Sequence, residues 1–195
     1  MEQVSTGIFA LDQVLDGGLP ERSAILVCGR PGSGKTILAH QIICHNASTE
    51  RKVVYFTTLA EPVVKVIKFQ QQFTFFKQDQ IQQSVIYQDL GSNLRNGDAA
   101  CCLAGITEVL RQHKPSLIVI DTLKTISEII TLPIKYREFI LDLTLRAAAW
   151  GCTTVLLGNM PRMIWTLVLK ALLPTVLYIC QEQKKRDSKN GFCVF

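Results

Sequence analysis

The feature that most constrains the fold of this sequence is one short run of residues, Gly29 to Thr36. It reads Gly-Arg-Pro-Gly-Ser-Gly-Lys-Thr and matches the phosphate-binding loop pattern G-x-x-x-x-G-K-[ST] at every fixed position. Glycines allow the backbone to curl so that successive N–H groups form a concave anion nest. Lys35 supplies an ammonium for the β and γ phosphates, and Thr36 supplies a hydroxyl that can bind Mg²⁺. The predicted nucleotide-binding residues are Gly29, Arg30, Pro31, Gly32, Ser33, Gly34, Lys35, Thr36 and Ile37.

The residues on either side of the loop fit this interpretation. Ser23 to Cys28 is a short apolar run of the kind that forms a buried parallel strand. After the loop, apolar residues repeat at helical spacing, which predicts a helix from Thr36 to about Asn46. The positive end of this helix dipole would point at the bound phosphates.

Length and composition bound the organisation of the chain. Its 195 residues suit one domain over 1–195, with a lead-in segment over 1–22 and a hairpin over 181–195. Hydrophobic residues make up 48% and charged residues 19%, which excludes global disorder. The seven cysteines show no C-x-x-C spacing and no secretory leader precedes them, so we expect reduced cysteines in a cytoplasmic protein.

One apolar stretch, Met163 to Cys180, raises the question of a membrane span. Lys170 lies at its centre and Pro174 interrupts it, and a central lysine costs roughly 2.5–3.5 kcal/mol on insertion scales. We therefore predict a buried helix followed by a strand from Thr175 to Cys180, and no membrane association.

Strand and helix signals alternate along the whole chain. This alternation predicts an α/β fold whose central sheet is mostly parallel and carries helices on both faces. The expected strands are 23–28, 52–58, 84–87, 117–121, 153–157 and 175–180. The expected helices are 36–46, 62–76, 99–113 and 134–150.

Two carboxylates are candidates for the second half of a nucleotide site. Asp121 ends the apolar strand 117–121 in a Walker B pattern, where it can hold Mg²⁺ through water; a helix-capping role is the alternative. Glu61 follows the strand 52–58, at the edge of the sheet where ligands bind in open α/β folds. It is a candidate for activating the water that attacks the γ phosphate, or else a first-turn glutamate that stabilises a helix.

The first fifth of the chain resembles a known family. The residues Ser5-Thr6-Gly7-Ile8, Leu11-Asp12, Leu15 and Gly17-Gly18-Leu19-Pro20 precede the loop, as in the KaiC-type branch of the RecA-like ATPases. The resemblance is specific over 4–43, and the order of elements agrees through about residue 180. It implies a RecA-like P-loop core, ATP with Mg²⁺, and a homo-oligomeric ring, often hexameric, that holds nucleotide between subunits. Lys35, Thr36, Asp121 and Glu61 take the corresponding catalytic and metal roles.

The chain departs from the family pattern in two places. The usual T-x-E-E after the second strand is Thr58-Leu59-Ala60-Glu61 here, so only the second glutamate is present. Relatives continue their last hairpin into a Lys-x-Arg element, whereas this sequence ends at Phe195 and has Lys184, Lys185 and Arg186 earlier, in the turn. From this truncated hairpin we expect slow hydrolysis. Asn159 is a candidate γ-phosphate sensor or a turn residue.

Three functions remain open from the sequence. The favoured one is an ATPase that hydrolyses ATP at a subunit interface. The second is a hydrolysis-poor switch or scaffold for a protein partner, which the sequence does not identify. The third is a DNA-handling recombinase-like ATPase, for which only Lys124, Lys135 and Arg137 fall near the expected position. Three charges in so long a stretch are more typical of a solvated face, so nucleic-acid binding is not favoured.

Overall fold

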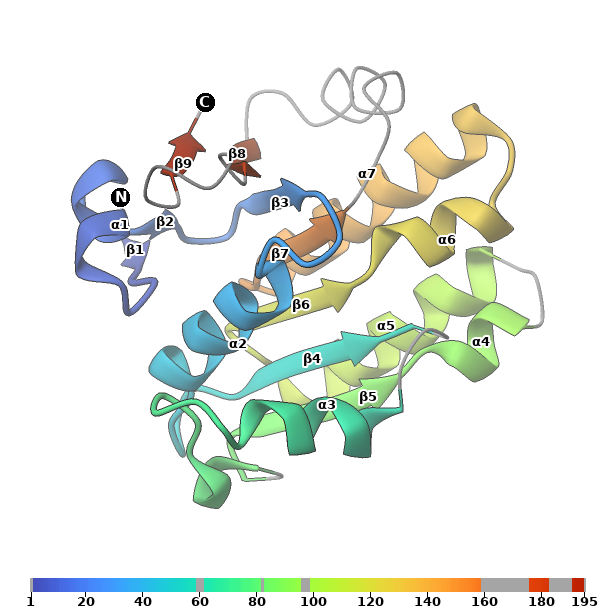
Figure 1. Cartoon of the computed structure of the whole chain (residues 1–195). Helices are drawn as coiled ribbons and strands as arrows, with labels where there is room; N and C mark the ends of the chain where they lie inside the picture. The colour runs from blue at the N-terminus through green and yellow to red at the C-terminus, as the bar shows by residue number, and fades with distance from the viewer. Residues whose placement is uncertain are drawn as a thin grey trace.

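The structure is a computed structural model that describes residues 2–58, 62–81, 83–95, 99–158, 176–182 and 191–194. Within these residues the core is a seven-stranded sheet in the order β5-β4-β6-β7-β3-β8-β9 (Figure 1). Its strands are β3 (Ala24–Gly29), β4 (Val53–Thr57), β5 (Val85–Asp89), β6 (Leu117–Asp121), β7 (Thr153–Gly158), β8 (Val176–Glu182) and β9 (Gly191–Val194). Every neighbouring pair is parallel except β8 and β9. The mostly parallel sheet predicted from the alternation is therefore confirmed.

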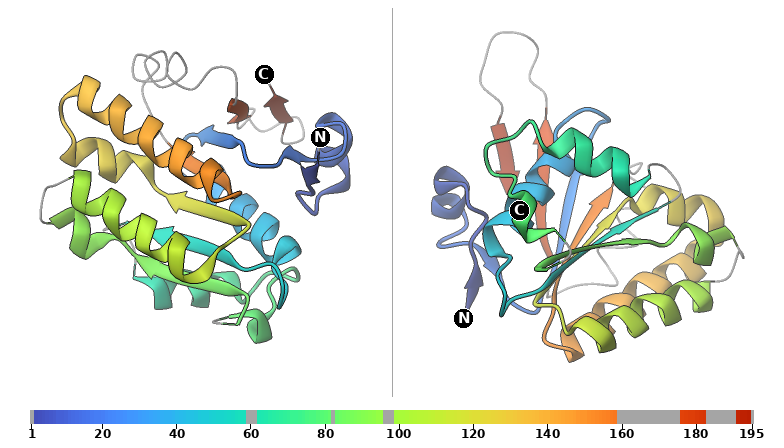
Figure 2. Two further views of the ribbon diagram at one scale, coloured as in Figure 1. Left: turned by 180° about the vertical axis from the view of Figure 1, so that it is seen from behind. Right: turned by 90° about the horizontal axis from the view of Figure 1, so that it is seen from below.

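Helices cover both faces of the sheet, as the sequence predicts. One face carries α5 (Ala99–His113), α6 (Leu123–Ile129) and α7 (Pro133–Ala149), and the short α4 (Gly91–Arg95) packs beside α5. The opposite face carries α2 (Lys35–Asn46) and α3 (Val63–Gln70). Figure 2 shows the two helical layers on opposite sides of the sheet.

Side chains of the central strands alternate between these two layers. In β4, Val54 and Phe56 join the core under α5 and α7, whereas Val53 and Tyr55 join the core under α2. All four are at most 1% exposed. Strands buried on both faces read as continuous apolar runs, which is why these segments could be recognised from sequence.

The lead-in segment folds against the α2 side of the sheet. It consists of β1 (Gln3–Val4), α1 (Phe9–Val14) and β2 (Leu19–Pro20), and β1 pairs antiparallel with β2. The connection between β1 and α1 is held by Asp12, which accepts hydrogen bonds from the Ser5 and Thr6 hydroxyls and from the Thr6 N–H. The Asn46 amide at the end of α2 donates to the Ser5 carbonyl over 2.7 Å and fixes the segment to the core.

One predicted helix is too long. We predicted helix from 62 to 76, but α3 ends at Gln70. Beyond it, Phe73 and Phe75 stack at 5.3 Å between ring centroids, and Phe75 and Phe76 pack on the α2-side core. A continuing helix would spread these aromatic rings around its axis, so their packing ends the helix early.

The C-terminal elements agree in type with the sequence prediction. The strand expected over 175–180 is β8, and it pairs with β9 in register from Ile179 opposite Val194 to Glu182 opposite Gly191. The hairpin was predicted over 181–195, whereas this antiparallel pairing begins earlier, at Ile179. The helix expected before β8 falls on 159–175, outside the described residues. In the part of the chain that the structure describes, no helix combines the length and apolarity of a membrane span.

Candidate functional site

The glycine-rich loop connects β3 to α2 at the carboxyl edge of the sheet. Gly29 is the last residue of β3, and the turn itself is made by Gly32 and Gly34, whose φ angles are 76° and 89°. Such left-handed backbone favours glycine. Gly34 is also the N-cap of α2, so this conformation directs the first N–H groups of the helix into the loop.

Lys35 is the first residue of α2, and its ammonium turns back into the loop. Its Nζ donates to the carbonyls of Gly29 and Arg30, each over 2.9 Å. Burial lowers the pKa of Lys35, while the nearby charges of Asp121 and Cys28 act in the opposite direction. A cation held by two neutral backbone carbonyls is available to exchange them for the stronger contact with phosphate oxygens.

Thr36 and Asp121 are brought together by the structure although they lie far apart in the sequence. The Thr36 hydroxyl at the start of α2 donates to Asp121 Oδ2, at the end of β6, over 2.8 Å. The backbone of Asp121 is fixed as well, because its carbonyl accepts a hydrogen bond from the Thr58 N–H over 3.0 Å. The two halves of the predicted site therefore meet at one point.

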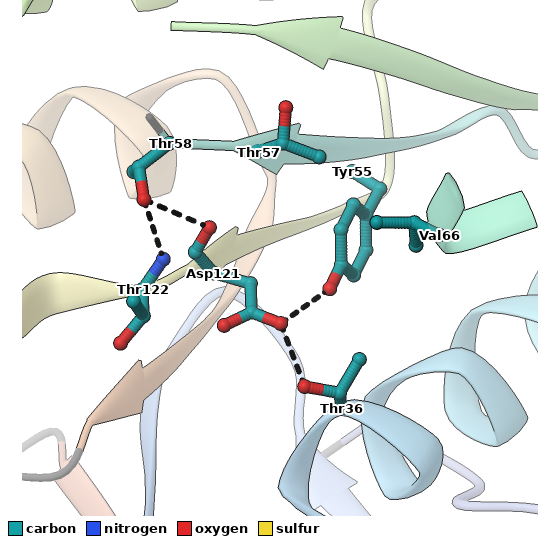
Figure 3. A pocket seen from close by; sticks show the side chains of 7 residues that line it. All are labelled: Thr36, Tyr55, Thr57, Thr58, Val66, Asp121 and Thr122. Carbon is teal, nitrogen blue, oxygen red and sulfur yellow. Dashed lines mark hydrogen bonds between the residues drawn. The ribbon is translucent and has the colours of Figure 1, made fainter. Parts of the chain in front are cut away.

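A cavity of about 250 Å³ opens at this point. The side chains that line it come from α2, β4, α3 and the end of β6 (Figure 3). They are Thr36, Tyr55, Thr57, Thr58, Val66, Asp121 and Thr122. Six of these seven residues carry a hydroxyl or a carboxylate, so the cavity can hold water and a hard cation.

The donor set fits Mg²⁺ by its chemistry. Mg²⁺ is bound in nucleotide sites by one or two protein oxygens together with phosphates and waters. Thr36 and Asp121 supply a hydroxyl and a carboxylate side by side. In Figure 3, both contacts to the Asp121 carboxylate fall on one of its oxygens, and the other carboxylate oxygen points away from them.

Among the residues of this site that were not identified from the sequence, two carry rings. Tyr55, on β4, donates its hydroxyl to Asp121 Oδ2 over 2.6 Å. His40, on α2, packs its ring against Tyr55 at 4.3 Å between centroids and bonds through Nδ1 to the Thr36 carbonyl. Burial lowers the pKa of His40 to about 4, although that hydrogen bond acts in the opposite direction. The neutral Nδ1–H therefore donates to the carbonyl at pH 7. The available signal was a tyrosine placed between the apolar residues Val54 and Phe56 of a buried strand.

The other predicted site residues differ in their exposure, and some lie outside the described part of the chain. Arg30 and Pro31 are exposed on the loop, Ile37 is half-buried, and Ser33 is buried. Glu61, with its neighbour Ala60, lies outside the described residues, as do Asn159 and the Lys184–Arg186 turn.

The cations considered for DNA binding lie on α6 and α7. Lys124 pairs with Glu128 over 3.5 Å, and Lys135 pairs with Glu138 over 3.0 Å. Each pair lies within a single helix, the first on α6 and the second on α7, and all four side chains are exposed. Because each lysine is balanced by a glutamate, this surface has little net positive charge from them.

A family model described as "ATPase: KaiC" matches residues 4–165 of the chain. A UPF0273 protein from Methanopyrus kandleri is 48% identical over 68 residues, which are 35% of this chain and 27% of that protein. A UPF0273 protein from Thermotoga maritima is 28% identical over 172 residues, covering 82% of this chain and 70% of that one.

A solved structure shows the same fold. It is titled as a KaiC-like protein from the hyperthermophilic archaeon Pyrococcus horikoshii OT3, and it superposes with a TM-score of 0.77 at 22% identity. The match covers 99% of this chain and 88% of the other. The fold is therefore that of a RecA-like P-loop domain, as the resemblance in the lead-in segment implied.

Proposed function

The chain belongs to the KaiC ATPase family, and on that premise we propose that it binds ATP with Mg²⁺ and hydrolyses the nucleotide. The observation that carries the proposal is the 2.8 Å contact between Thr36 and Asp121. It joins the glycine-rich loop to a carboxylate at the tip of a central strand, the arrangement that P-loop enzymes use for a metal-bound triphosphate.

Each residue has a part in this proposal. Lys35 exchanges its two backbone carbonyls for the β and γ phosphate oxygens, and the N–H groups around Gly32 and Gly34 hold the remaining charge. Thr36 and Asp121 would hold Mg²⁺ with their hydroxyl and carboxylate oxygens. Glu61 is assigned to orienting the attacking water. The nucleotide supplies the phosphoryl group, and Mg²⁺ offsets the charge on its oxygens when bound.

Assembly and location are part of the proposal. We infer that the chain forms a homo-oligomeric ring, with nucleotide held between neighbouring subunits, because it belongs to this family. A cytoplasmic location is supported by Cys44, Cys101, Cys102 and Cys152, which form no disulfide among the described residues.

The competing function is a nucleotide-dependent switch that binds ATP, assembles and turns it over slowly. Ala60 supports it, because this position carries the first of the two glutamates in relatives. DNA handling is supported less, since Lys124 and Lys135 are already paired.

Steady-state hydrolysis of Mg-ATP over a range of protein concentrations separates the first two functions. For an interface ATPase we expect turnover per subunit to rise with concentration and to disappear in Glu61→Gln. Glu50→Gln is the matched control, because Glu50 is exposed and precedes β4, at the opposite edge of the sheet from the loop. ATP binding without turnover would favour the switch. Unchanged turnover in Glu61→Gln would remove Glu61 from the mechanism.

A further inference from the structure

A buried tyrosine on the α2 face of the sheet places its hydroxyl next to the candidate metal site. Tyr55 occupies the middle of β4, is 1% exposed, and stands where its strand neighbours Val53, Val54 and Phe56 are apolar. A buried tyrosine needs a hydrogen-bond partner for its hydroxyl. The partner here is Asp121 Oδ2, at 2.6 Å.

The same carboxylate oxygen accepts two hydrogen bonds from different elements. Thr36 Oγ1 approaches from α2 at 2.8 Å, and Tyr55 approaches from β4. Hydrogen bonds to a carboxylate are shorter and stronger than those between neutral groups. With Oδ2 held twice, the plane of the carboxylate is fixed and Oδ1 is turned away from both donors (Figure 3).

Tyr55 is itself held in place by two rings. His40 packs on it at 4.3 Å, and Tyr87 on β5 lies 5.5 Å from it between centroids. His40 also bonds to the carbonyl of Thr36 over 2.8 Å. The ring cluster therefore connects the first turn of α2, which carries the Thr36 hydroxyl, to the strand that carries the tyrosine.

We propose that Tyr55 is a positioning residue for the metal site: it holds the Asp121 carboxylate so that Oδ1 faces the bound cation. Tyr55 acts through Asp121 and does not touch the nucleotide. The inference rests on the proposed Mg-ATP function and adds a residue to it. Outer groups that orient a metal ligand typically change metal affinity by about 10–100-fold when they are removed.

The test is the Mg²⁺ dependence of ATP binding in Tyr55→Phe. This change removes one hydroxyl and keeps the ring packing. Tyr87→Phe is the matched control, because Tyr87 belongs to the same ring cluster and its buried hydroxyl makes no hydrogen bond among the described residues. ATP binding is measured by calorimetry in EDTA and then at increasing Mg²⁺, with thermal unfolding of each variant alongside.

We expect the Mg²⁺ concentration for half-maximal enhancement of ATP binding to rise about 10-fold in Tyr55→Phe. Binding in EDTA should equal that of the unmodified chain, and Tyr87→Phe should change neither quantity. An unchanged Mg²⁺ dependence in Tyr55→Phe would overturn the proposal. So would a parallel loss of binding with and without Mg²⁺, because that result indicates a structural role alone.

A second variant tests whether Tyr55 acts through Asp121. In an Asp121→Asn background, Tyr55→Phe should have no further effect on the Mg²⁺ dependence, because the group it positions no longer binds the metal. Two independent, additive effects would contradict the proposal. Failure of the proposed function is distinguishable from both results: the unmodified chain would then bind no ATP in either EDTA or Mg²⁺, and the inference would fall with it.

Discussion

The two faces of the central sheet differ in the hydrogen bonding of their buried polar atoms. Both cores consist of aliphatic, aromatic and cysteine side chains. On the α5–α7 face, the buried hydroxyl of Thr144 bonds back to the Ile140 carbonyl over 2.9 Å. On the α2 side, by contrast, several buried polar atoms have no hydrogen-bond partner among the described residues. They belong to Ser33, His40, Thr57, Gln70, Gln80 and Tyr87.

This difference indicates that the two faces of the sheet have different roles. A buried polar atom without a partner costs about 1–3 kcal/mol, so the α2 side gives up stability that the other face retains. Two of its unpartnered residues, Ser33 in the loop and Thr57 in the cavity lining, lie at the candidate site. Departures from ideal burial are expected where a site needs polar groups. We therefore assign stability mainly to the α5–α7 face and ligand chemistry to the α2–α3 face.

The largest predicted effect is on the α5–α7 face. Phe139 on α7 is 2% exposed, so Phe139→Ala should lower the free energy of unfolding by about 3–5 kcal/mol through the cavity it leaves. ATP affinity of the folded protein should be unchanged. Leu145→Ala, at a position on the same helix that is 58% exposed, is the control and should change stability by under about 0.5 kcal/mol. A loss of ATP affinity in folded Phe139→Ala would contradict the comparison between the two faces.

A smaller effect of opposite sign is predicted on the α2–α3 face. Gln70 ends α3 fully buried, with neither amide atom paired among the described residues. Gln70→Leu should raise the free energy of unfolding by about 1–3 kcal/mol, because it removes a desolvated amide and keeps the volume. Chemical denaturation measures it, and Gln71→Leu at the exposed neighbouring position is the control. A loss of stability in Gln70→Leu would show that the amide is satisfied.

The smallest predicted effect concerns acid and the lead-in segment. Burial raises the pKa of Asp12, but hydrogen bonds from Ser5 and Thr6 outweigh it and hold the pKa below its usual range. A depressed carboxyl pKa contributes stability above about pH 4 that is lost as pH falls through the folded-state value. Asp12→Asn should cost about 1 kcal/mol at pH 7, with the difference shrinking below pH 4.

Unfolding free energies of the unmodified chain and Asp12→Asn, measured from pH 7 to pH 3, check this expectation. Asp16→Asn makes the same change at an exposed carboxylate of the same segment and should have little effect at any pH. A difference between Asp12→Asn and the unmodified chain that stays constant with pH would contradict the assigned role of the charge.

Sequence reasoning reached most of the fold because its strongest signals are local. The loop from Gly29 to Thr36, the strand ending at Asp121 and the helix over 99–113 each carry their own pattern. The early end of α3 at Gln70 was missed, since the packing of Phe75 and Phe76 on a distant core decides it. The lead-in strands were missed because each has only two residues.

The site was predicted in part for the same reason. Thr36 and Asp121 belong to motifs that have a fixed place in the fold, so their meeting was expected. Tyr55 belongs to no motif, and its contact with Asp121 depends on the register of β4 against β6, which places Thr57 opposite Asp121. Tyr55, two residues earlier, points to the same face. Pairing of this kind can be known only once the sheet is assembled.

The central claim is that the α2–α3 face holds a Mg-ATP site built on Lys35. Calorimetric titration of ATP in the presence of Mg²⁺ tests it most directly, on the unmodified chain, Lys35→Ala, and Lys68→Ala at an exposed position of α3 as the control. We predict saturable binding that weakens about 100-fold or more in Lys35→Ala, about 2.8 kcal/mol, and is unchanged in Lys68→Ala. Wild-type affinity in Lys35→Ala, or no saturable binding by the unmodified chain, would contradict the account.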